Sequence, residues 1–192
     1  MGSATIEAMV PRGKATYADI LGLPEHVTGE LIDGELYTQA RPRGPHAIVA
    51  SGLGIDLGGA FHRGRGGPGG WWILDEPELH LGPDVLVPDV AGWRRERMPS
   101  IPEGVSFTAA PDWVAEVSSP STARVDRLRK LPVYAREGVR HVWLVDPDAR
   151  TVEALALVDA RFVLLGYFGE TKEARIAPFD AVPLDLDALF ER

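Results

Sequence analysis

Hydrophobic and polar residues alternate along much of this 192-residue chain, a pattern typical of strands with one buried face. Residues 29–40 form two such runs joined by Asp33-Gly34, and an Asp-Gly link of this kind predicts a β-hairpin. A second hairpin is predicted around Asp159-Ala160. Four further strands are predicted in the middle of the chain, over 71–81, 84–93, 112–118 and 141–147.

Other segments follow the helical period instead. Residues 46–61 place apolar side chains three and four positions apart, which predicts a helix. Its glycines lower the helix propensity by up to about 1 kcal/mol each relative to alanine. A second helix is predicted over 121–138, because residues 120–122 carry start signals and Gly138 is a stop signal. Shorter helices are predicted within 15–24 and 182–190.

The order of these elements predicts an α/β fold. A strand, a helix and a strand follow one another over residues 112–147, which predicts a right-handed crossover between parallel neighbours. We therefore expect a single domain over 1–192, with a central mixed β-sheet flanked by helices and an N-terminal β-hairpin. Residues 1–14 are expected to form a flexible N-terminal segment, and the glycine-rich stretch 62–70 a loop.

The composition narrows the classes of function. No cysteine is present, which excludes disulfides, thiolate metal ligands and cysteine nucleophiles. Asp and Glu number 28 against 20 Lys and Arg, and the net charge of −8 argues against a general nucleic-acid coat. Arginines nevertheless cluster within 94–97 and 124–140. No apolar run reaches the roughly 18 residues of a membrane span, and no secretory signal is recognisable, so we expect a cytoplasmic protein.

Two carboxylates and one lysine stand out by their positions. Glu116 interrupts the otherwise apolar strand "WVAEV", where an ionised carboxylate needs a partner or a metal. Asp89 lies in the strand predicted before it, and alternation places it on the same face as Val85, Val87 and Ala91. Lys130 is four residues from both Asp126 and Tyr134, so the three share one helix face, and we interpret Asp126 and Tyr134 as structural.

The other helix face carries Leu128, Leu131 and Ala135, and we expect this apolar face to pack on the sheet. If the strands of Asp89 and Glu116 are neighbours, their carboxylates converge. Mg²⁺ binds one or two carboxylates together with waters and a substrate phosphate, and a lysine nearby would suit phosphodiester hydrolysis. The residues alone leave two alternatives open: strand-end carboxylates with a solvent-facing lysine, and a metal-free acid–base hydrolase such as a glycosidase.

Five segments occur in one order between Tyr17 and Phe190: "GELIDGELY", "VPDV", "WVAEVSSPSTARVD", "KLPVYAREGVRHVWLVDP" and "VPLDLDALF". In this order they resemble the Uma-two family of restriction endonucleases, within the PD-(D/E)xK nuclease superfamily. The resemblance implies a restriction-endonuclease-like core and a hydrolase that cleaves nucleic acid, with DNA as the expected substrate. It also implies Mg²⁺ as the cofactor, with Mn²⁺ as a substitute, and a homodimer.

The resemblance further implies roles for single residues. The segment "VPDV" supplies Asp89 as a metal ligand, and "VAEV" supplies Glu116 as the second, with the carbonyl of Val117 as a further ligand. Glu30 matches the family's N-terminal glutamate and is expected to complete the catalytic site. The clustered arginines would contact the phosphate backbone rather than read bases.

The lysine is the point at which this chain departs from the superfamily. It normally stands two positions after the acidic residue, where this chain has Ser118. In the Uma-two pattern it lies on the following helix, which gives Lys130 as the residue that positions the attacking water. Pro132 is expected to bend this helix, and His46 matches a family histidine without an assigned role. The rival interpretation is a catalytically silent nuclease-fold module that binds or regulates.

Overall fold

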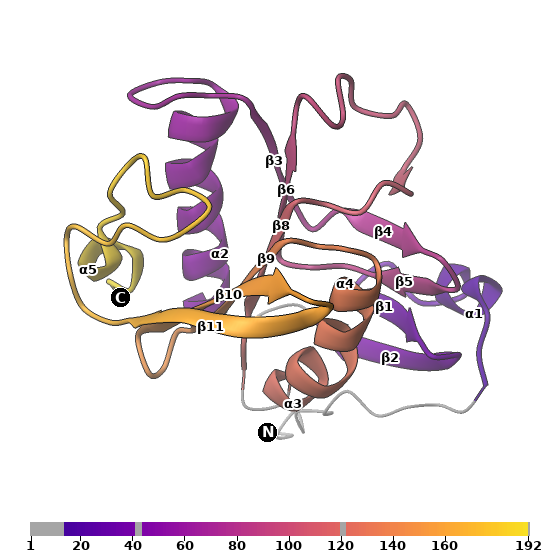
Figure 1. Cartoon of the computed structure of the whole chain (residues 1–192). Helices are drawn as coiled ribbons and strands as arrows, with labels where there is room; N and C mark the ends of the chain where they lie inside the picture. The colour runs from indigo at the N-terminus through magenta and orange to yellow at the C-terminus, as the bar shows by residue number, and fades with distance from the viewer. Residues whose placement is uncertain (1–13, 41–43, 120–121, 192) are drawn as a thin grey trace.

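A six-stranded mixed sheet forms the centre of the molecule in this computed structural model, which describes residues 14–40, 44–119 and 122–191 (Figure 1). Its strands from one edge to the other are β11 (Arg161–Phe168), β10 (Thr151–Val158), β9 (His141–Asp146), β8 (Trp113–Val117), β6 (Val90–Arg94) and β3 (Trp71–Asp75). β8 and β9 run parallel, and the other neighbours run antiparallel. The predicted α/β class with a central mixed sheet is confirmed.

A helical crossover joins the parallel strands β8 and β9, as the order of elements predicts. It consists of α3 (Ala123–Val125), the π-helical turn η2 (Asp126–Lys130) and α4 (Leu131–Arg136). Pro132 lies in the first turn of α4, directly after the π-helical turn. Because proline has no N–H, the wider turn occurs where a regular helical hydrogen bond is missing. The predicted helix start at Pro120 and Ser121 lies outside the described residues.

A second sheet of five strands accompanies the first. In order, its strands are β2 (Glu35–Ala40), β1 (Val27–Ile32), β5 (Asp84–Leu86), β4 (Glu78–Leu81) and β7 (Ser106–Phe107). β1 and β2 form the predicted hairpin, and its turn residues Asp33 and Gly34 both have positive φ, 54° and 75°, as a two-residue turn requires. Lys14 bridges to Glu35, whereas residues 1–13 of the expected flexible segment lie outside the described residues.

Two of the predicted strands are divided between the sheets. Residues 71–81 contribute β3 to the central sheet and β4 to the second, and the chain turns at Glu76, whose φ is 46°. Residues 84–93 contribute β5 and β6, with a break around Pro88, which has no N–H for a ladder. The prediction of two continuous strands is therefore wrong, and Asp89 lies in the link before β6.

Different elements cover the two faces of the central sheet (Figure 1). One face carries α2 (Gly44–Leu57), its π-helical continuation η1 (Gly58–His62) and α5 (Leu186–Leu189). The other face carries α4 and the second sheet, beside which the short α1 (Tyr17–Leu21) packs on β1. Among the helices of the described residues, none has the length and apolar character needed to cross a membrane.

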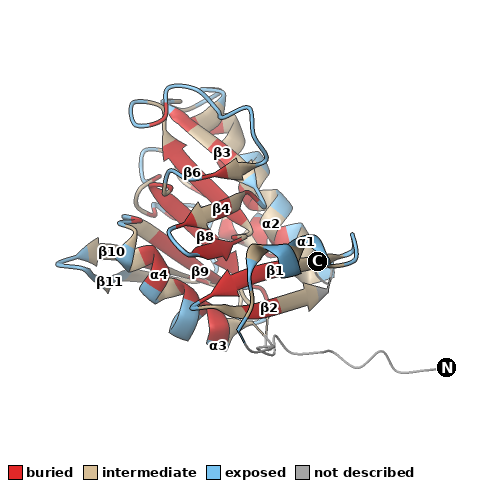
Figure 2. Cartoon of the chain, turned by 90° about the vertical axis from the view of Figure 1, so that its right-hand side faces the viewer, coloured by how far each residue is buried: buried red, intermediate tan, exposed pale blue. Residues whose placement is uncertain are grey.

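The crossover helix buries its polar face. Leu128 is 60% exposed, whereas Asp126, Lys130 and Tyr134 are exposed by no more than 2%. The prediction that this apolar face packs on the sheet is therefore wrong for Leu128, whereas Leu131 is partly buried against the core. The strands β6 and β8 beneath are buried along most of their length (Figure 2), so the charges of Asp126 and Lys130 are removed from water and need partners.

Candidate active site

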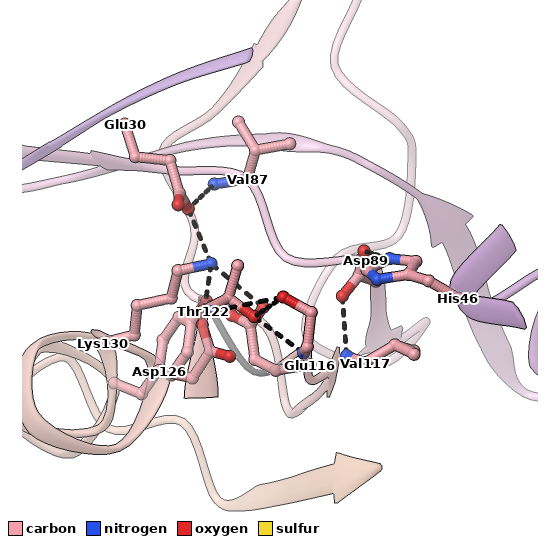
Figure 3. A network of polar contacts seen from close by, with 11 residues as sticks. Glu30, His46, Val87, Asp89, Glu116, Val117, Thr122, Asp126 and Lys130 are labelled. Atoms are coloured by element: carbon pink, nitrogen blue, oxygen red, sulfur yellow. Dashed lines mark hydrogen bonds and ion pairs between the residues drawn. The ribbon is translucent and has the colours of Figure 1, made fainter. Parts of the chain in front are cut away.

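Asp89 and Glu116 come from neighbouring parts of the central sheet. β6 pairs with β8, with Val90 opposite Ala115, so Asp89 lies beside the end of β8 that carries Glu116. The Asp89 carboxylate accepts a hydrogen bond from the backbone N–H of Val117 at 2.7 Å (Figure 3). The structure therefore brings both predicted carboxylates to one end of the sheet.

His46 reaches the same carboxylate from the first turn of α2. Its Nε2 lies 2.6 Å from Oδ1 of Asp89, and the two side chains are only 14% and 13% exposed. The Asp89 carboxylate is thus held on both oxygens, by His46 on one and by the Val117 N–H on the other. These two contacts fix the orientation of the Asp89 side chain.

Lys130 lies at the centre of a buried cluster of carboxylates (Figure 3). Its Nζ is 3.0 Å from Oε1 of Glu30 and 3.0 Å from Oε2 of Glu116. Oδ1 of Asp126, one helical turn earlier, is 3.6 Å away. The alternative of a solvent-facing lysine is therefore wrong, and Pro132 does not direct Lys130 away from Glu116.

Glu30 connects the second sheet to this cluster. It lies in β1, is fully buried, and its Oε1 also accepts a hydrogen bond from the N–H of Val87 at 2.8 Å. Its other oxygen, Oε2, is buried and has no hydrogen-bond partner among the described residues. A buried carboxylate oxygen without a donor is costly, so a further donor or a cation fits at this position.

Tyr134 and Asp126, for which the sequence predicts only a structural role, belong to the same cluster. The Tyr134 hydroxyl donates to Oε1 of Glu116 at 2.5 Å, while Lys130 donates to Oε2. Both oxygens of Glu116 are therefore bonded. The signal in the sequence was the spacing of four residues on either side of Lys130, because such residues share one helix face.

Burial and crowding shift the pKa values in the cluster. Burial raises the pKa of Glu116 well above its usual value; Lys130 opposes this rise, and the neighbouring carboxylates add to it. Burial also raises the pKa of Asp126 to about 6, again against the effect of Lys130. For Lys130 itself, burial favours the neutral form, but the surrounding carboxylates outweigh burial and raise its pKa well above the usual value. Lys130 is therefore an ammonium at neutral pH.

The oxygen donors of this cluster are of the kind that a hard divalent cation takes. Three carboxylates contact the single ammonium of Lys130 and Asp89 adds to the negative charge around it, so a further cation would relieve the repulsion that adds to the burial-raised pKa of Glu116. Mg²⁺ and Mn²⁺ take oxygen ligands, and Mg²⁺ keeps several waters, so two carboxylates can be enough. No group of three or more His, Asp or Glu side chains within the described ranges is arranged to hold a metal. Backbone oxygen and water would have to complete the coordination.

The clustered arginines make contacts within the fold. Arg95 stacks on Trp72, with its guanidinium carbon 3.7 Å from the ring centroid, and Arg97 pairs with the buried Asp112 at 2.8 Å. Most of the second cluster is paired as well: Arg127 with Glu153, Arg129 with Asp33 and Glu35, and Arg136 with Asp84. Arg124 is exposed, and over the described ranges it takes part in no ion pair. Phosphate contacts by these arginines stay a prediction.

Comparison with known proteins identifies the family. The model of the Uma2 family, described as "Putative restriction endonuclease", matches residues 15–187. None of the curated proteins matches the chain. A solved structure of a "putative nuclease belonging to DUF820" from Anabaena variabilis ATCC 29413 has the same fold, with a TM-score of 0.72 and 24% identity over 91% of this chain and 97% of that one. Because the family match extends over most of its length, this chain belongs to the Uma2 family of restriction-endonuclease-like proteins.

Proposed function

We propose that this protein is an endonuclease that uses Mg²⁺ or Mn²⁺ to hydrolyse phosphodiester bonds in DNA. The observation that carries the proposal is the position of Lys130, whose ammonium contacts Glu116 from the following helix. A cation and two carboxylates thus gather at one end of adjacent strands, although Ser118 stands where the superfamily has its lysine. We take DNA as the substrate because the family is described as restriction endonucleases.

Asp89 and Glu116 would hold the divalent cation, together with the carbonyl of Val117. The N–H and C=O of one residue in a β-strand point to the same side, so this carbonyl faces the side on which the Val117 N–H meets Asp89. When bound, the cation would polarise the scissile phosphate and lower the pKa of a bound water. His46 already orients the Asp89 side chain, which limits the conformational entropy that Asp89 would lose when the divalent cation binds.

Lys130 would act as an ammonium and not as a general base. Its raised pKa keeps it protonated at neutral pH, so it has no lone pair with which to take a proton from water. An ammonium can orient the attacking water and stabilise the negative charge that develops on the phosphate. Its burial strengthens this effect, because bulk water screens the charge less.

The other members of the cluster would position these groups. Glu30 and Asp126 hold the Lys130 side chain from two sides, and Tyr134 holds the Glu116 carboxylate. None of these three needs to contact the substrate in order to act. The resemblance implies that Glu30 completes the catalytic site, and in this proposal it does so through the contact that keeps Lys130 aimed at Glu116.

The test is cleavage of supercoiled plasmid, single-stranded DNA and RNA in the presence of Mg²⁺, Mn²⁺ or EDTA. We expect metal-dependent cutting of DNA by the wild type, and a loss of about a hundredfold or more in Asp89→Asn and in Glu116→Gln, because each removes a charged ligand while keeping the shape. Lys130→Met, made as a third single variant, is also expected to reduce the rate of cutting. Glu153→Gln is the matched control, since this glutamate is ion-paired but lies on β10.

The outcomes separate the site from the function. Metal-dependent cutting that survives both carboxylate substitutions removes the site assignment. No cutting of any substrate, together with no binding of Mg²⁺ or Mn²⁺ by calorimetry, favours the silent nuclease-fold module. Cutting of RNA alone overturns the choice of DNA. Circular dichroism of every variant shows whether a loss of cutting reflects a loss of fold.

Three wider expectations belong to this proposal. A cytoplasmic protein, a single domain over 1–192 and a homodimer all fit a nuclease of this family. Analytical ultracentrifugation tests the homodimer directly. Limited proteolysis tests the single domain, because a linker between two domains would be cut first.

A further inference from the structure

β11 leaves one edge of the central sheet open. It is the last strand in the order of the sheet, and among the described strands it pairs with β10 alone (Figure 1). The hairpin of β10 and β11 projects from the molecule next to α4, and its tip is exposed (Figure 2). An open edge presents unpaired backbone N–H and C=O groups, which makes it a template for another strand.

The exposed side chains on this edge are apolar. Val163, Leu164, Leu165 and Tyr167 are 41%, 57%, 49% and 63% exposed. Residues 162–169 contain no charged residue and no proline. Edge strands are normally protected by charges, by proline or by a covering element, and an uncovered apolar segment of this kind promotes aggregation. A partner that covers β11 would remove this hazard.

We propose that a second copy of this chain covers the edge, with the two β11 strands side by side and antiparallel about a twofold axis between Leu165 and Gly166. Continued two residues past the end of β11 at Phe168, this register places Arg161 of each copy opposite Glu170 of the other, so two pairs of opposite charge flank the uncharged stretch. A twofold contact uses the same surface on both copies, so no second apolar patch is needed. The proposal rests on the homodimer expected under the proposed function and assigns its contact surface, and it is independent of the nuclease chemistry.

The side chains at both ends of the stretch are exposed to solvent and within reach of a partner. Arg161 is exposed, and Glu170 is 64% exposed, with its Oε1 on Arg150 of its own chain at 3.2 Å. A carboxylate can accept from two guanidinium groups at once, so the existing pair does not prevent the second.

A β-bulge lies at the proposed axis. The pairing of β10 with β11 shifts at this point, with Ala154 opposite Gly166 and Leu155 opposite Leu164, which leaves Leu165 as the extra residue. A bulge disturbs regular pairing locally. With the axis at the bulge, residues 161–164 of each copy face residues 167–170 of the other, of which Phe168 is the last residue of β11, and the irregular residues meet at the centre.

The first test is the mass of the full chain by sedimentation equilibrium over a wide range of concentration, without metal or DNA. We expect a monomer–dimer equilibrium for the wild type. Leu164→Lys is expected to raise the dissociation constant at least about tenfold, because it places a charge in the apolar contact. Val105→Lys is the matched control, since Val105 is 85% exposed outside β11 and its substitution is expected to leave the equilibrium unchanged.

The second test fixes the register of the two strands. Because the chain has no cysteine, a single introduced cysteine reports only on its own position. Leu165→Cys, beside the axis, is expected to form a disulfide between copies under mild oxidation. Val158→Cys is the control: it is equally exposed, on the same hairpin, but far from the axis along the strand, and it is expected to stay reduced in the dimer.

The charge pairs provide the third test. Arg161→Glu is expected to weaken the dimer about tenfold, and the added change Glu170→Arg to restore it. A monomeric wild type at every concentration overturns the proposal. So does a dimer that Leu164→Lys leaves intact, or one that crosslinks as well through Val158→Cys as through Leu165→Cys. A monomeric wild type would also contradict the homodimer expected for this family, but none of these results bears on the nuclease chemistry, because no step of it uses β11.

Discussion

The two faces of β8 are packed against different kinds of side chain, aromatic on one face and charged on the other. On one side, Trp113 packs edge-to-face against Trp143 and Phe179, with ring centroids 5.1 Å and 4.9 Å apart. On the other side, only three residues along the same strand, Glu116 contacts the ammonium of Lys130. We call these the aromatic side and the charged side. The residues on both sides are exposed by only a few per cent, so burial alone does not distinguish the two sides.

The difference lies in what burial does to the free energy of folding. Burying an aromatic side chain stabilises the fold by removing apolar surface from water. Burying several carboxylates around one ammonium stabilises it little or not at all, because desolvation opposes the attraction. A chain could fill the charged side with apolar residues at no loss of stability. The charged side is therefore the part of the interior for which a role other than folding has to be sought.

The largest expected effect comes from Lys130→Met. The substitution leaves Glu30, Glu116 and Asp126 buried without their shared cation, and we expect the free energy of unfolding at neutral pH to fall by about 3–5 kcal/mol. This loss should shrink as the pH is lowered, because the carboxylates then take up protons and no longer need a counterion. Urea denaturation at neutral and acidic pH measures both effects.

Trp143→Ala is the matched substitution on the aromatic side. Trp143 is fully buried, and its removal is expected to lower the free energy of unfolding by a similar amount, about 3–5 kcal/mol. A cavity does not titrate, so this loss should be the same at both pH values. An equal pH dependence for the two variants would contradict the distinction between the two sides.

A smaller effect is expected from the titration of Asp126. Its pKa in the folded protein is raised from 3.8 to about 6, mainly by burial, so the folded state favours the protonated form. The stability that protonation contributes is fully present below about pH 4 and is lost as the pH rises through about 6. Asp126→Asn cannot titrate and should lack this decline, which urea denaturation across that range measures.

Asp159→Asn serves as the control for this prediction. Asp159 is an exposed turn residue with a φ of 48°, a conformation that asparagine tolerates well. Its substitution should leave the pH dependence as it is in the wild type. If Asp126→Asn declines with pH as steeply as the wild type, Asp126 is not the group that titrates.

Much of the fold could be predicted from local sequence signals. Asp33-Gly34 specifies its own turn, and the strand–helix–strand order around Glu116 specifies the crossover, because both depend on residues close together in the chain. The second sheet could not be predicted in this way. The breaks at Glu76 and Pro88 send parts of two apolar runs into different sheets, and only long-range packing decides which part goes where.

The site could be predicted only in part, because polar residues on a helix are normally read as exposed. The spacing of Asp126, Lys130 and Tyr134 shows that they share a helix face, but it does not show that this face packs against Glu116. The resemblance to a nuclease family supplied the reason to place Lys130 there. It supplies none for Tyr134 or Asp126, so the sequence predicts only a structural role for these two residues.

The smallest expected effect tests which face of the crossover helix is buried. Leu128 is 60% exposed, so Leu128→Lys should change the free energy of unfolding by no more than about 0.5 kcal/mol. Val133→Lys on the buried face of the same helix is the contrast, because Val133 is 1% exposed and has no partner for a charge in its apolar surroundings. If Leu128→Lys instead destabilises the protein as strongly as Val133→Lys, the apolar face packs inward after all. Lys130 would then face solvent, and Glu116 on the charged side of β8 would lose its ammonium partner.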